Sequence, residues 1–146
     1  MKKLFKMLLA TLFTVIMAIS FASCTITGGL SLEKVGEKLK ELGYEIELTV
    51  DEKDLKEIAE AENCGELLAV LTVFVSEESA RYTAASIVWF KNNEDAELFV
   101  KQYQEFLDSL PEDYKAGEIP KIVSKDNFVV MGFSVAYEDV CKIMNV

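Results

Sequence analysis

The sequence contains no histidine among its 146 residues, and this absence removes several kinds of active site. Ser-His-Asp and Cys-His nucleophile arrangements, histidine proton shuttles and histidine-ligated zinc all need an imidazole, so this chain alone cannot assemble them. The seven glycines form neither G-x-G-x-x-G nor G-x-x-x-x-G-K-[ST], and no C-x-x-C occurs. These absences predict a protein that is not an enzyme and that needs no cofactor or metal.

Charged side chains are also missing from residues 7–22, MLLATLFTVIMAISFA, which follow three lysines within the first six residues. A positive start, an apolar run and small residues before a cut are the three parts of a secretory signal peptide. The final stretch, Phe21-Ala22-Ser23-Cys24, resembles the lipobox of bacterial lipoproteins, with Phe21 where such proteins most often carry Leu. The resemblance implies that Cys24 receives a diacylglycerol and becomes the first residue of a mature, membrane-anchored protein.

Two other interpretations of the same residues stay open. Ser20 and Ala22 occupy the small-residue positions before an ordinary signal-peptidase cut, which would leave Cys24 as a free thiol. The second alternative is an uncleaved anchor, because no charge appears between Lys6 and Glu33, although the strongly apolar part is shorter than the ~20 residues of a spanning helix. All three interpretations place the rest of the chain outside the cytoplasm. The lipoprotein interpretation places it at the cell membrane or the outer membrane, held by the lipid on Cys24.

Basic residues are scarce, and the predicted processing makes them scarcer. The chain has 15 Lys and Arg against 25 Asp and Glu, and removal of residues 1–23 with their three lysines changes the net charge from −10 to −13. Such a charge argues against nucleic acid and anionic lipid as direct partners of the folded part. Residues 24–31 then form a tether that reaches at most roughly 25 Å. A single domain at 32–146 would therefore lie near the membrane and its proteins.

The apolar periodicities predict alternating helices and strands in this domain. Ser31 is the expected N-cap of the first helix, and Gly43 is the residue expected just after its end. We expect helices at 32–42, 52–62, 94–110 and 137–144, strands at 44–50, 67–76, 81–91, 121–124 and 128–136, and an irregular polar loop at 111–120. The order αβαββαββα predicts an α+β domain, a mostly antiparallel sheet with helices packed on one face. The inner βαββαβ order is that of a ferredoxin-like split unit.

Cys64 and Cys141 are the cysteines that remain after Cys24. In an oxidising compartment two cysteines in one exported domain suggest a disulfide, which would stabilise the fold by about 4 kcal/mol on the chain-entropy estimate. The alternative is two unrelated buried thiols, because Cys141 lies beside Val140 on a short apolar helix and cysteine packs well as a small hydrophobe. The spacing of the two residues does not choose between these alternatives.

Acidic residues gather at two predicted helix starts: Asp51, Glu52 and Asp54, and Glu94, Asp95 and Glu97. Carboxylates in such groups can bind calcium or supply a general acid and base. Neither group has the glycine-centred loop of an EF-hand, and helix N-termini ordinarily collect acids because of the helix dipole. The capping interpretation is therefore favoured.

Aromatic side chains provide a second candidate site. Tyr82, Trp89, Phe99 and Tyr103 could line an apolar pocket between a helix and the sheet. The alternative is plain hydrophobic core, since aromatics at these spacings usually pack inside.

Three functions from different classes remain. The first is a non-enzymatic, membrane-anchored lipoprotein that binds a protein or a small ligand. The second is an acidic inhibitor or immunity-type protein that neutralises a basic partner, since the charge of −13 would steer such a partner electrostatically. The third is a histidine-free enzyme that uses carboxylates, Tyr or Lys, for which no residue set stands out. The first is the prediction that the sequence favours.

Overall fold

The computed structural model describes residues 31–77, 80–115 and 117–146, without the side chains of Glu77 and of residues 80–82. Cys24, the predicted signal peptide and the tether up to Leu30 lie outside the described residues. The chain divides into two compact units, residues 1–37 and residues 38–146. The described residues of the first unit, 31–37, include the start of helix α2. The second unit contains the whole sheet.

Helix α2 spans Leu32–Glu41, so it begins at the predicted residue and ends one residue before the predicted end. The Ser31 hydroxyl accepts a hydrogen bond from the Lys34 amide at 3.3 Å, which satisfies one of the unpaired donors of the first turn. Gly43 has φ +91°, and its amide donates to the Lys40 carbonyl at 2.9 Å. This left-handed residue ends the helix and leads into the first strand.

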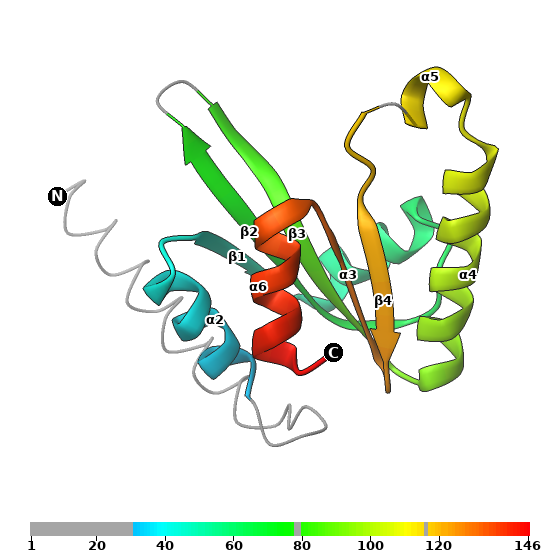
Figure 1. The fold of residues 1–146 in the computed structure, drawn as a ribbon. Helices are drawn as coiled ribbons and strands as arrows, with labels where there is room; N and C mark the ends of the chain where they lie inside the picture. The colour runs from blue at the N-terminus through cyan, green and yellow to red at the C-terminus, as the bar shows by residue number, and fades with distance from the viewer. Residues whose placement is uncertain (1–30, 78–79, 116) are drawn as a thin grey trace, which may run out of the picture. The chain divides into compact units, whose positions relative to one another are not determined.

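Five strands form one sheet in the order β1-β2-β3-β5-β4, and all neighbours are antiparallel (Figure 1). The strands are β1 (Glu45–Thr49), β2 (Leu67–Glu77), β3 (Ala80–Phe90), β4 (Lys121–Lys125) and β5 (Phe128–Gly132). The α+β class is confirmed. The ferredoxin-like order is not found, because a split βαβ unit requires parallel strands and this sheet pairs its strands as hairpins, with β5 beside β3.

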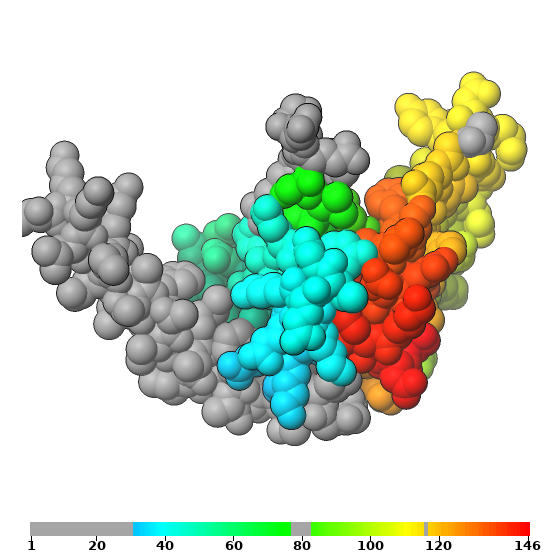
Figure 2. Space-filling view, turned by 60° about the vertical axis from the view of Figure 1, so that its left-hand side comes forward, coloured from blue at the N-terminus to red at the C-terminus, as the bar shows by residue number. Residues whose placement is uncertain are grey.

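Helices cover both faces of the sheet, and not one face as the sequence predicted. Helices α3 (Glu52–Ala61) and α4 (Asn93–Ser109) pack against a core that contains Val88 and Phe90 of β3. Helix α6 (Ser134–Met144) packs on β3 and β5 from the other side, as Figure 1 shows. Figure 2 shows α6, in red, on the near surface of that view. The reason is that β2 and β3 are apolar on both faces, so both faces must be shielded from water.

Strand β5 ends earlier than predicted, at Gly132, because of a bulge in β3. Ala84 is the extra residue of that bulge, and its carbonyl accepts a hydrogen bond from the Phe133 amide at 2.9 Å. A Cβ atom on Gly132 would lie 2.6 Å from the same carbonyl oxygen. The chain then turns at Ser134, with φ +37°, directly into α6.

The segment 111–120 is not wholly irregular, since it contains the short helix α5 (Glu112–Lys115). The Tyr114 amide donates to the Pro111 carbonyl at 3.0 Å, and an ion pair joins Lys115 to Glu112 at 3.3 Å. In the part of the chain that the structure describes, no helix is both long and apolar enough to cross a bilayer.

Candidate functional site

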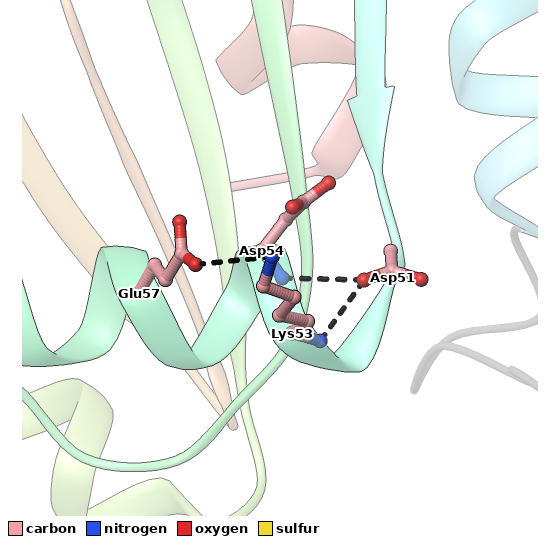
Figure 3. A network of polar contacts seen from close by, with 4 residues as sticks. All are labelled: Asp51, Lys53, Asp54 and Glu57. Atoms are coloured by element: carbon pink, nitrogen blue, oxygen red, sulfur yellow. Dashed lines mark hydrogen bonds and ion pairs between the residues drawn. The ribbon is translucent and has the colours of Figure 1, made fainter.

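Asp51 positions helix α3, which forms one wall of the candidate site. Its Oδ1 accepts hydrogen bonds from the amides of Lys53 at 3.0 Å and Asp54 at 3.3 Å, as Figure 3 shows. The side chain of Lys53 also forms an exposed ion pair at 3.7 Å with Glu57, which lies one turn further along the helix. Asp51 thus caps the helix through two amides that would otherwise lack partners.

Asn92 caps helix α4 in a similar way. The Asn92 Oδ1 accepts from the Asp95 amide at 2.8 Å, and its side-chain amide donates to Asp95 Oδ2 at 2.8 Å. Among residues 31–77, 80–115 and 117–146, no group of three His, Cys, Asp or Glu side chains has a geometry that could hold a metal ion. The Asp51 carboxylate caps α3, and the Asp95 carboxylate is held by the side chain of Asn92.

A groove of about 770 Å³ runs between helix α3 and the chain that leads from its end into β2. Its lining residues are Val50, Glu52, Leu55, Lys56, Ala59, Glu60, Asn63, Cys64, Gly65, Glu66, Leu67 and Leu68. Leu55 is buried and forms part of an apolar floor, whereas Leu68 is 41% exposed at the groove. We call this feature the α3 groove.

Acidic side chains surround the apolar part of the α3 groove. Glu52, Glu60 and Glu66 are among its lining residues, with Lys56 as the single base. Just outside it, Lys91 donates a hydrogen bond of 2.5 Å to Glu66, and this bond raises the pKa of Lys91. The groove thus combines apolar surface with a negative rim, which can accept a cationic partner through charge-assisted hydrogen bonds.

Cys64 also lines the α3 groove, and it is a free thiol. Partial burial raises its pKa, and the negative charge of Glu62 raises it further, so that the thiolate is disfavoured at neutral pH. Cys141 is likewise free and lies on α6, which covers the opposite face of the sheet. In this structure the two cysteines are separate thiols, the second of the two alternatives, and they lie on opposite sides of the sheet.

The predicted aromatic pocket is brought together only in part. Phe99 and Tyr103 stack with centroids 6.2 Å apart, and Phe90 meets Phe99 at 5.5 Å. Trp89 points to the other face of β3, where it packs against Phe128 at 6.4 Å. The side chain of Tyr82 lies outside the described residues. The rings on α4 form a row from the core to the surface and line no common pocket with Trp89.

Acidic residues are distributed unevenly between the two helix-covered faces. The segments 51–66 and 91–110, which contain α3 and α4, hold 12 of the 25 acidic residues and four of the 15 basic ones. The segment 133–146, which contains α6, holds two acidic residues and one basic residue. We call the side formed by α3 and α4 the acidic face. The sequence alone did not reveal it, since the prediction placed every helix on one side.

Comparisons of the chain with protein-family models, with curated proteins and with solved structures found no match. The geometry, burial and charge of the chain's own side chains therefore carry the functional interpretation. The acidic face and the α3 groove are the features that distinguish one side of the molecule from the other.

Proposed function

We propose that this protein is a membrane-anchored extracytoplasmic lipoprotein whose domain binds a partner and does not catalyse a reaction. The anchor is supported by the signal-peptide pattern and by the resemblance of Phe21-Ala22-Ser23-Cys24 to a lipobox. Mass analysis of the N-terminal peptide tests this part. It is expected to begin at Cys24 and to carry a diacylglycerol, and an unmodified Met1 or a thiol at Cys24 would contradict it.

The partner that the structure favours is a basic protein, as an inhibitor or immunity-type role would require. The single observation that carries this choice is the grouping of 12 acidic residues on the segments 51–66 and 91–110, which contain α3 and α4. A one-sided field orients and accelerates the approach of a positively charged surface, whereas evenly spread charge does not. The short tether makes a protein in or on the same membrane the most accessible partner.

The enzyme alternative gains no comparable support. It requires an inward-facing acid beside a pocket, with its protonation displaced by burial. Among the described residues no acidic side chain is buried, and the acids of the α3 groove stand at its exposed rim. A binding surface uses such exposed carboxylates directly.

Photo-crosslinking in intact cells tests the binding proposal. A photoreactive residue at Gln102, exposed on α4, is expected to capture one protein with a basic surface. The same residue at Val135, which is 64% exposed on α6, is the matched control and is expected to capture much less of that protein. Equal capture at both positions, or capture of an acidic protein at Gln102, would contradict the proposal.

A further inference from the structure

The α3 groove differs from the rest of the acidic face because it offers apolar surface as well as charge. Leu68 is 41% exposed there, and Leu67 and Val50 are half-buried. Exposed leucine beside a concave apolar floor is the arrangement in which a partner's large side chain becomes an anchor. A surface that bound its partner through charge alone would not need such a recess.

The residues around this floor restrict the chemistry of what fits it. Glu52 and Glu60 both belong to α3, eight residues or about two turns apart, and so stand on nearly the same side of the helix. Glu66 lies on the opposite wall, where Lys91 from outside the groove already pairs with it, and Lys56 is the one base among the described lining residues. An apolar segment without positive charge would desolvate the carboxylates of Glu52 and Glu60 without offering them a hydrogen bond, whereas lysine or arginine would satisfy them.

We propose that the α3 groove receives a protein segment in which a large apolar side chain stands next to lysine or arginine. This inference rests on the proposed binding of a basic partner and names where and how that partner docks. A volume of about 770 Å³ is sufficient for one or two large side chains with part of their backbone. The large apolar side chain contributes affinity, and the neighbouring lysine or arginine pairs with the carboxylates of the acidic rim.

Cys64 supplies a reporter of groove occupancy, with Cys141 as an internal control on the other side of the sheet. The full chain is treated with a maleimide, and mass spectrometry follows the alkylation of each cysteine separately. The probe is a synthetic octapeptide of alternating lysine and leucine. At about ten times its Kd, it should slow Cys64 alkylation about tenfold. The rate at Cys141 should not change.

Two further peptides separate the contributions of charge and apolar surface. One alternates lysine and serine, and the other alternates glutamate and leucine. The inference predicts that neither protects Cys64 at the concentration at which the lysine-leucine peptide does. Equal protection by either peptide overturns the inference, since the groove would then recognise charge alone or apolar surface alone.

Substitution of one exposed leucine tests the anchor directly. Leu68→Ser should weaken binding of the lysine-leucine peptide about tenfold or more, because a leucine-sized contact is lost. Leu98→Ser is the matched control, since Leu98 is 51% exposed on α4 outside the groove lining. It should leave the affinity unchanged. The emission of buried Trp89 confirms that both variants are folded.

The outcomes distinguish this inference from the proposed function. If both lysine peptides bind the protein with equal affinity and Leu68→Ser has no effect, the acidic face binds cations without the groove. The docking inference then fails and the proposed function stands. If neither lysine peptide binds at all, both fail.

Discussion

Replacement of Gly65 by alanine tests the packing that holds the α3 groove against helix α4. A Cβ atom on Gly65 would lie 2.7 Å from the Cβ of Asp95 and would also overlap the Cγ and Oδ2 atoms of that side chain. Rotation of the carboxylate alone cannot relieve a contact with its own Cβ. Either the turn at 63–66 or the first turn of α4 must therefore move.

The expected destabilisation follows from two contributions. Overpacking of this kind costs about 1 to 3 kcal/mol. Displacement of Asp95 also breaks the 2.8 Å hydrogen bond from Asn92, a bond worth about 1 kcal/mol. Gly65 does not have a left-handed φ, so alanine adds no backbone strain. We expect Gly65→Ala to lower the free energy of unfolding by about 2 to 4 kcal/mol.

Urea unfolding measures this change, with Trp89 as the probe because it is the sole tryptophan and is 2% exposed. Gly117→Ala is the matched control. Its added Cβ would have a single neighbour within 4 Å, the Tyr114 carbonyl oxygen at 3.6 Å. This variant should change stability by less than about 0.5 kcal/mol, or stabilise slightly. Equal stabilities of the two variants would refute the proposed close packing of Gly65 on Asp95.

Three further predictions concern the fold that carries the site. Gly132→Ala should cost at least about 2 kcal/mol in thermal unfolding, because its Cβ would meet the backbone of the bulge at Ala84, 2.6 Å from the carbonyl oxygen. Asp51→Ala should cost about 1 kcal/mol through loss of the α3 cap, and Asp51→Ser should recover most of it; urea midpoints that do not differ would exclude the capping role. Burial and the 2.8 Å hydrogen bond to Asp139 raise the pKa of Tyr44 from 10.0 to about 12. This contribution to stability is complete below pH 10 and is lost as the pH rises toward 12, so Tyr44→Phe should reduce the loss of thermal stability across that range.

Much of the local structure could be predicted because short-range chemistry decides it. Ser31 caps α2, and Gly43 adopts the left-handed conformation after it, as their positions indicated. The five strands were likewise found from apolar alternation and apolar runs. The predicted ends of strands and helices were less accurate where a distant segment determines them. The end of β5 at Gly132 is an example, because no local pattern reveals the close contact of Gly132 with Ala84.

The candidate site could be predicted less well, because it depends on which face of the sheet each helix covers. Successive residues of a strand point to opposite faces, so Phe90, and not Trp89, meets Phe99 of α4. That alternation was readable in the sequence, and its use would have removed Trp89 from the predicted pocket. The separation of Cys64 from Cys141 and the grouping of the acids arise only from the tertiary arrangement.

The most direct test of the central claim is the association rate of the crosslinked partner with two charge-reversal variants. Glu105→Lys changes one exposed acid on the acidic face, and Glu138→Lys makes the same change on α6. We predict that Glu105→Lys slows association severalfold at low salt and that the difference shrinks at high salt, while Glu138→Lys leaves the rate nearly unchanged. Equal effects of the two variants, or rates independent of salt, would contradict the claim that the acidic face receives a basic partner.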